Sequence, residues 1–382
     1  MSGISGKAET ALLVSIDFGD SDYQESLLEL QLLAETAGVR VIGCIEGKRQ
    51  RPDAALFAGS GKVQEIAELV EAREIPLVIF NHDLSPAQMR NLAGALQTRV
   101  IDRTMLILDI FAQRAKSHEG KVQVELAQLK YLSTRLVGMN TDMGQQKFAV
   151  GARGPGETQL ELDRRKLDKR VHLLKERLER LKAQRVVQRR ARDRNDVLSV
   201  SIVGYTNAGK STLFNRMTKA NTYVANQLFA TLDTTSRKLF VEGAGSIVIS
   251  DTVGFIRHLP HGLVAAFRST LEETVHADLL VHVVDASNPC CDDQIVEVNK
   301  VLAEIDAGEI PQLLVFNKID LMDVPPSVQR DDYGKITRVF LSARSGEGLD
   351  GLRQALCEAS LACQKVVALE NQIKRERNKP WD

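Results

Sequence analysis

The sequence has 382 residues, a length that suggests two or three domains with a sizeable core in each. Apolar residues make up 43% and charged residues 26%, which excludes a disordered or collagen-like chain. The 50 Lys and Arg residues balance the 50 Asp and Glu residues, so a globally basic nucleic-acid binder is excluded, although a local basic face is not.

Membrane and secretory classes are also disfavoured. No apolar run reaches the roughly 18 residues that a membrane span needs, and the first ten residues lack the apolar core of a secretory signal. The five cysteines show no metal-binding spacing and favour reduced thiols. We therefore expect a cytoplasmic protein, and a monomer.

The first part of the chain alternates between apolar strands and helices. Pro86 stands at a first helical position after Ser85, which marks the start of one of these helices. The strands are expected at residues 11–17, 39–47 and 76–80, and the stretch 56–62 is expected to run from a further strand into glycines. This alternation predicts a parallel sheet with packed helices, an N-terminal α/β domain over residues 1–118.

Residues 119–195 are predicted to form a helical coiled-coil hairpin. The pattern from Gly120 to Leu136 is that of an amphipathic helix. A second helix carries a heptad seam, made of Leu167, Val171, Leu174, Leu178 and Leu181. The stretch 138–156 between them has five glycines and no period, so residue chemistry alone leaves a plain linker and a functional loop as equal alternatives.

The second helical region is locally basic. Residues 161–194 hold 14 Lys or Arg and 6 Asp or Glu, a net charge of +8 in a neutral chain. Charge alone leaves two readings, the solvated face of a hairpin or an arm that contacts phosphates. The cluster Arg189–Arg194 goes beyond what a hairpin face needs.

A phosphate-binding loop follows the next apolar strand, 198–203. Gly204–Ser211, called the P-loop from here on, fits the pattern G-x-x-x-x-G-K-[ST] and leads into a helix, which is the context that the motif requires. Its glycines let backbone N–H groups surround phosphates. Lys210 can then reach the β- and γ-phosphates, and the Ser211 hydroxyl can bind Mg²⁺. A GTPase domain is predicted over residues 196–363, followed by a polar tail at 364–382.

Two more segments suit the triphosphate end of such a site. Asp251–Gly254 ends a strand, so its carboxylate can hold the Mg²⁺ water shell and the Gly254 N–H can face a γ-phosphate. The stretch 229–235 lies where a loop that senses the γ-phosphate is expected. Any of three threonines in it can bring a hydroxyl to Mg²⁺, and the residues alone do not choose among Thr231, Thr234 and Thr235.

Guanine specificity is expected from Asn317–Asp320. The Asp320 carboxylate can accept hydrogen bonds from N1–H and N2–H₂ of guanine, whereas adenine leaves it unpaired. The expected preference for GTP over ATP is about a thousandfold in affinity. Asn317 would tie this loop to the P-loop, the Lys318 stem would cover the base, and Ser342–Arg344 would contact the guanine oxygen. The full expected nucleotide-binding set is Gly204, Tyr205, Thr206, Asn207, Ala208, Gly209, Lys210, Ser211, Thr212, Phe229, Ala230, Thr231, Leu232, Asp233, Asp251, Thr252, Val253, Gly254, Asn317, Lys318, Ile319, Asp320, Ser342, Ala343 and Arg344.

The residue after Asp251–Gly254 bears on catalysis. Many GTPases place a Gln there to orient the attacking water, but this chain has Phe255, which has no hydrogen-bonding group. The group that positions water is therefore not identified by the sequence. We expect slow hydrolysis by the protein alone and strong stimulation by a partner.

Together these motifs resemble the HflX GTPases. The resemblance rests on GPGETQLE at 154–161 with DRR at 163–165, on the P-loop, on FATLD at 229–233, on DTVGFIRHLP at 251–260 and on NKID at 317–320. It covers residues 11–363. It implies an N-terminal α/β domain, a helical hairpin and a Ras-like P-loop GTPase domain with a mostly parallel sheet.

The resemblance also implies a function. Members of the family bind GTP and GDP, associate with the large ribosomal subunit and its RNA, and help to dissociate stalled or idle ribosomes, which in turn stimulate hydrolysis. It assigns the basic region and the loop 138–156 to ribosomal RNA. The resemblance implies that Ser211 and Thr231 are the Mg²⁺ ligands. Members of the family also have an apolar residue at the position of Phe255.

Three features depart from the family. The segment before Gly154 lacks a G-G-I-G stretch, Thr234–Thr235 stands where Pro-Thr is usual, and the sequence ends at Asp382 without the further C-terminal domain of many members. An alternative function is a GTP-gated RNA-binding or ribosome-assembly module without splitting activity. An ATPase or P-loop kinase is disfavoured by Asp320. Gly59, Gly61 and Lys62 lack the P-loop spacing, so they do not indicate a second nucleotide site.

Overall fold

The structure, a computed structural model, falls into two compact units, Met1–Glu179 and Arg180–Asp382. It describes residues 9–20, 22–137, 164–181, 183, 197–219, 227–257, 259–260 and 271–377, with side chains described as far as residue 364. The GPGETQLE run and the Arg189–Arg194 cluster lie outside the described residues. Within the described ranges, every helix is too short or too polar to cross a membrane.

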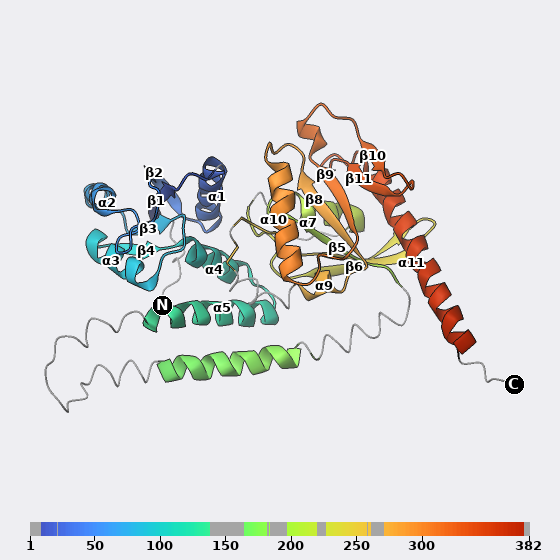
Figure 1. Cartoon of the computed structure of the whole chain (residues 1–382), viewed down its shortest axis with the longest axis horizontal. Coiled ribbons are helices and arrows are strands. Elements are labelled where there is room, and N and C mark those ends of the chain that lie inside the picture. The colour runs from blue at the N-terminus through green and yellow to red at the C-terminus, as the bar shows by residue number, and fades with distance from the viewer. Residues whose placement is uncertain are drawn as a thin grey trace. The chain divides into compact units, whose positions relative to one another are not determined.

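The first unit contains a four-stranded sheet in the order β2-β1-β3-β4, and all neighbouring strands are parallel. The strands are β1 (Thr10–Asp17), β2 (Arg40–Lys48), β3 (Leu77–Phe80) and β4 (Arg99–Ile101), and the helices are α1 (Tyr23–Thr36), α2 (Ser60–Ala72), α3 (Pro86–Leu96) and α4 (Arg103–Arg114) (Figure 1). The central strands β1 and β3 are buried, as expected for a parallel sheet between helices. The predicted α/β fold is confirmed.

The strand expected within residues 56–62 does not form, so this prediction was wrong. Phe57 makes only an isolated antiparallel bridge to Asp53. The physical reason is a side-chain turn: Asp53 Oδ1 accepts the backbone N–H groups of Ala55 and Leu56 at 2.9 and 2.8 Å. These bonds bend the chain just before α2 begins at Ser60.

The predicted helical hairpin is confirmed in the same unit. Helix α5 (His118–Val137) packs against a helix at residues 164–181. Their shared apolar cluster comprises Val122, Leu126, Leu174 and Leu178, with Val171 and Leu129 beside it. Every heptad position from Leu167 to Leu181 is buried or half-buried, whereas the other residues of 164–181 are exposed. The 3.5-residue period therefore marks the contact face correctly.

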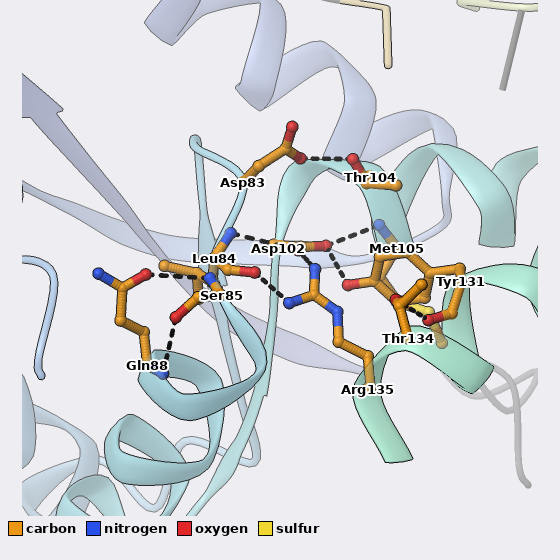
Figure 2. Close-up of polar contacts among 10 residues, drawn as sticks. All are labelled: Asp83, Leu84, Ser85, Gln88, Asp102, Thr104, Met105, Tyr131, Thr134 and Arg135. Carbon is orange, nitrogen blue, oxygen red and sulfur yellow. Dashed lines mark hydrogen bonds and ion pairs between the residues drawn. The ribbon is translucent and has the colours of Figure 1, made fainter. Parts of the chain in front are cut away.

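A buried polar joint fixes the last turn of α5 to the sheet domain (Figure 2). The carboxylate of Asp102, which is fully buried, accepts the Arg135 guanidinium at 2.8 Å, the Tyr131 hydroxyl at 2.7 Å and the Met105 N–H at 2.9 Å. Arg135 also donates to the carbonyl of Leu84. Burial raises the pKa of Asp102, and the Tyr131, Met105 and Arg135 contacts oppose that shift. Both oxygens of the carboxylate thus have hydrogen-bond partners.

Replacing Arg135 with Met is expected to lower the free energy of unfolding by about 3 kcal/mol, because it leaves the Asp102 carboxylate buried without its counter-charge. Denaturant unfolding of the full chain measures this loss. Arg170→Met is the matched control, since the Arg170–Glu125 pair is exposed and such pairs contribute at most about 1 kcal/mol. Equal losses in the two variants would contradict the view that the joint stabilises the unit.

The second unit has a seven-stranded sheet in the order β10-β11-β9-β8-β5-β7-β6. The inner strands are parallel, and the edge strands β6 and β10 are antiparallel to their neighbours. The strands are β5 (Ser199–Gly204), β6 (Thr235–Val241), β7 (Gly245–Asp251), β8 (Leu279–Asp285), β9 (Gln312–Asn317), β10 (Ser327–Arg330) and β11 (Ile336–Phe340). The predicted mostly parallel sheet of a Ras-like domain is confirmed.

Helices pack on this sheet and complete the core of the second unit (Figure 1). They are α7 (Lys210–Thr218), α9 (Glu272–Val275), α10 (Cys291–Glu304) and α11 (Leu349–Arg377), with a 3₁₀ turn η2 (Ile319–Leu321). Helix α11 runs through the predicted boundary between the GTPase domain at 196–363 and the polar tail at 364–382. The domain boundaries themselves stay a prediction.

Candidate nucleotide-binding site

The P-loop has the backbone that its glycines permit. Gly204 ends β5 with φ +143° and Gly209 precedes α7 with φ +94°. A Cβ on Gly204 would lie 2.2 Å from the Val283 carbonyl, and a Cβ on Gly209 would lie 2.2 Å from the Asn317 amide nitrogen. Neither position accepts a side chain, so the loop stays close to Val283 on β8 and to Asn317 at the end of β9.

Lys210 lies inside the loop rather than on the surface. Its side chain is buried, and Nζ donates to the Tyr205 carbonyl at 2.7 Å. Burial lowers the pKa of Lys210 from 10.5 to about 8, and the nearby Asp251 charge opposes the shift. The ammonium is thus held in a site that disfavours its charge, a condition that an incoming phosphate would relieve.

This arrangement predicts proton uptake on nucleotide binding. Below pH 8 the ammonium is already present; between about pH 8 and 10.5 the free protein has lost much of that proton, and a bound phosphate raises the Lys210 pKa and takes a proton back. Calorimetry of GDP binding at pH 9 in buffers of different ionisation enthalpy should show uptake of nearly one proton. At pH 7 Lys210 should contribute none. A buffer-independent enthalpy at pH 9 would rule out this titration.

Three oxygen-bearing side chains converge beside Lys210. Ser211 Oγ lies 2.7 Å from Asp251 Oδ2 and 2.7 Å from Thr231 Oγ1, and Thr231 Oγ1 lies 3.0 Å from the same carboxylate oxygen. Asp251 is buried at the end of β7. Burial raises its pKa, while the Ser211 and Thr231 hydrogen bonds and the Lys210 charge oppose that rise. The three segments that supply these groups are far apart in sequence.

The donor set fits Mg²⁺. Hydroxyl and carboxylate oxygens are the ligands that Mg²⁺ takes alongside phosphates. The second carboxylate oxygen of Asp251, Oδ1, is buried and has no hydrogen-bond partner among the described residues. In the same described part of the chain, no group of three or more His, Cys, Asp or Glu is arranged to hold a metal. The site is therefore suited to a cation that brings its remaining ligands as phosphate or water.

Gly254 closes the pocket from the side of β7. A Cβ on it would lie 2.8 Å from Lys210 Nζ and 3.0 Å from Thr206 Cα, so a side chain here would fill the space next to the ammonium. The next residue, Phe255, is 1% exposed, and its ring is thus turned away from solvent. It cannot orient water at the pocket.

The segment Asn317–Asp320, which is expected to bind the guanine base and is called the base loop here, is joined to the P-loop by Asn317. The Asn317 amide donates to the Ala208 carbonyl at 2.8 Å, and its oxygen accepts the Ala343 N–H at 2.8 Å. Lys318 donates to Asp285 Oδ2 at 2.6 Å. Asp320 lies in η2 with its side chain exposed. The Asn317 bridge confirms the expected tie between the loops, while base recognition by Asp320 stays a prediction.

The pocket itself gathers the P-loop and the two segments around Thr231 and Gly254. Its lining residues are Thr206, Asn207, Gly209, Lys210, Ser211, Thr212, Gln227, Phe229, Ala230, Thr231, Thr252 and Gly254. Leu232 and Val253 are instead packed in the interior. The lining residue Gln227 was not expected from the sequence, and neither was Asp285, although Asp285, like Asp251, is a carboxylate at the end of a parallel strand.

This fold and this site are those of a P-loop nucleotide-binding protein, and the comparisons with known proteins make it a GTPase, an enzyme that hydrolyses GTP. Three family models match the chain: "GTP-binding GTPase N-terminal" over residues 24–112, "GTP-binding GTPase Middle Region" over 114–192 and "50S ribosome-binding GTPase" over 199–318. The chain belongs to the HflX family of GTPases.

Individual relatives agree with this assignment. A GTPase HflX of Escherichia coli is 55% identical over 351 residues, which are 92% of this chain and 82% of the relative. A GTPase HflX of Caldanaerobacter subterraneus is 47% identical over 356 residues, 93% of this chain and 82% of the relative. Among solved structures, SsGBP in complex with GDP is similar, with 26% identity, a TM-score of 0.50, and coverage of 93% of this chain and 99% of that one.

Proposed function

We propose that this GTPase is a switch that binds the large ribosomal subunit in its GTP form and helps to dissociate stalled or idle ribosomes. The observation that carries the proposal is the presence, in one chain, of a nucleotide pocket with a buried Phe255 at the usual position of the water-orienting residue and of an exposed basic helix. The matched description "50S ribosome-binding GTPase" supports the choice of partner.

Different residues of the site bind different parts of the nucleotide. Lys210 and the P-loop N–H groups bind the phosphates, the Gly254 N–H faces the γ-phosphate, and Asp320 reads the guanine edge. Ser211 and Thr231 would hold Mg²⁺, which, when bound, neutralises charge that develops on the phosphates. Asp251, hydrogen-bonded to both hydroxyls, keeps these two side chains oriented.

Hydrolysis by this pocket should depend on the partner. Phe255 occupies the position of the usual water-orienting residue and is buried, so the isolated protein lacks that group there. The ribosome would either supply it or reposition a residue of the chain. Turnover would then follow ribosome binding and time the release of the protein.

The helix at residues 164–181 offers a surface for RNA. Its eight basic residues outnumber three acidic ones, and all eight are exposed: Arg164, Arg165, Lys166, Lys169, Arg170, Lys175, Arg177 and Arg180. The apolar hairpin contact uses the seam, and Arg170 also pairs with Glu125 on α5. A concentrated positive face suits binding to RNA phosphates.

Replacing Lys169, Arg177 and Arg180 with Ala should weaken binding to large subunits and flatten the dependence of log K on log salt by about two to three. Removing the same number of exposed cations from the GTPase unit, at Lys300, Lys335 and Arg353, is the control. Co-sedimentation across a salt series measures both. An unchanged slope in the first variant would remove the basic helix from the interface.

Sucrose gradients separate the proposed role from the assembly alternative. With a non-hydrolysable GTP analogue, the proposal predicts loss of the 70S peak and growth of the subunit peaks. A ribosome-assembly or RNA-binding module predicts co-sedimentation without splitting. Protein that remains at the top of the gradient with either nucleotide would overturn both.

A further inference from the structure

The P-loop and the segment after Asp251 form a short additional ladder beyond the main sheet. Strands β5 and β7 pair with Ile202 opposite Asp251. Beyond a bulge at residues 252–254 the pairing resumes, with Tyr205 opposite Phe255. The Phe255 N–H donates to the Gly204 carbonyl at 3.1 Å, and the Phe255 carbonyl accepts the Thr206 N–H at 2.7 Å. We call residues 255–257 the clasp segment.

The side chain of Tyr205 adds a bond that the ladder does not require. Its hydroxyl accepts the Arg257 N–H at 2.9 Å, and its ring is largely buried. The carbonyl of the same residue accepts Lys210 Nζ at 2.7 Å. Tyr205 thus contacts the phosphate-binding lysine through its backbone and the clasp segment through its side chain.

The far end of the clasp segment is anchored as well. The Arg257 guanidinium is buried and lies 3.7 Å from Asp293 in the first turn of α10. Between these anchors the bulge carries Gly254 into the pocket, against Lys210 and Thr206. Any loosening of the clasp segment would therefore move Gly254, whose N–H is proposed above to face the γ-phosphate.

We propose that Tyr205 is a positioning residue that makes the pocket discriminate GTP from GDP, by holding residues 255–257 so that Gly254 faces the γ-phosphate. GDP has no γ-phosphate and gains nothing from this order. A triphosphate gains its full contact only in molecules whose clasp segment keeps its bonds to Gly204, Tyr205 and Thr206. We call this state closed. When the closed fraction falls, the apparent affinity for the triphosphate falls by the same factor. The inference rests on GTPase chemistry and does not depend on the ribosome.

The variant Tyr205→Phe tests this, because it removes one hydroxyl and keeps the ring. The readout is the ratio of dissociation constants for a non-hydrolysable GTP analogue and for GDP, measured by calorimetry. Loss of a hydrogen bond shifts an equilibrium constant by about three- to tenfold, so the ratio should rise, by at most about tenfold. Tyr333→Phe is the matched control, since Tyr333 is 96% exposed in the same unit, and its ratio should equal that of the wild type.

An equal loss for both nucleotides in Tyr205→Phe would overturn the proposal, because it would mean that the hydroxyl merely supports the P-loop. An unchanged ratio with unchanged affinities would overturn it too. Hydrogen exchange of the wild-type protein gives a second test that needs no variant. Amides of residues 252–257 should be more protected with the analogue than with GDP, and equal protection would contradict the proposal.

Discussion

Replacing Asp320 with Asn is expected to lower the affinity for GTP by about a thousandfold and to create affinity for xanthosine nucleotides. The carboxylate that would accept two hydrogen bonds from guanine becomes an amide, which leaves donors of guanine unpaired. The amide donor complements the additional carbonyl of xanthine. Competition binding with GDP and XDP measures both changes.

Binding of XDP serves as the control for this variant. Because Asp320 is exposed in η2, the substitution should not disturb the core, and recovered binding of XDP would show that the pocket is intact. Retained guanine preference would mean that another group reads the base. ATP should compete poorly with GTP for the wild-type protein, since adenine offers Asp320 no donor at N1.

Replacing Lys210 with Met should lower the affinity for GTP and GDP by at least about a hundredfold, because it removes a charge-assisted contact to the phosphates. The nucleotide-free variant should keep the native fold, because Met keeps most of the volume of Lys210, although the buried Asp251 carboxylate loses a compensating charge. Nucleotide titration and circular dichroism of the free protein give the two measurements.

Lost affinity in a protein that keeps its native fold distinguishes loss of a ligand contact from misfolding. Lys300→Met is a suitable control, since Lys300 is exposed on α10 and pairs only with Glu297 among the contacts described. It should change neither value. A Lys210→Met protein that binds GTP and GDP as tightly as the wild type would contradict the assignment of Lys210 to the phosphates.

Much of the fold could be predicted because its signals are local and periodic. The heptad seam from Leu167 to Leu181 marks the hairpin contact, and alternating apolar strands mark the first sheet. The three-residue strand β4 (Arg99–Ile101) is too short to show a pattern. The stretch 56–62 was misjudged because the Asp53 side chain, and not the apolar run, decides the backbone there.

The site could be predicted where a motif fixes its own geometry. The spacing of Gly204, Gly209 and Lys210 suffices for the P-loop, since the backbone has few alternatives there. Contacts between distant segments could not be predicted in this way. The Tyr205 hydroxyl meets Arg257 only because β5 and β7 are neighbours with a particular register, and no pattern in either segment encodes that register.

The most direct test of the account is GTP turnover by the purified protein with and without large ribosomal subunits. The buried Phe255 and the exposed basic helix together predict slow hydrolysis alone and a rise of at least about a hundredfold with subunits, equal to a lowering of the barrier by about 3 kcal/mol. Fast turnover without subunits, or no rise on adding them, would contradict the proposal that this GTPase is switched by the ribosome.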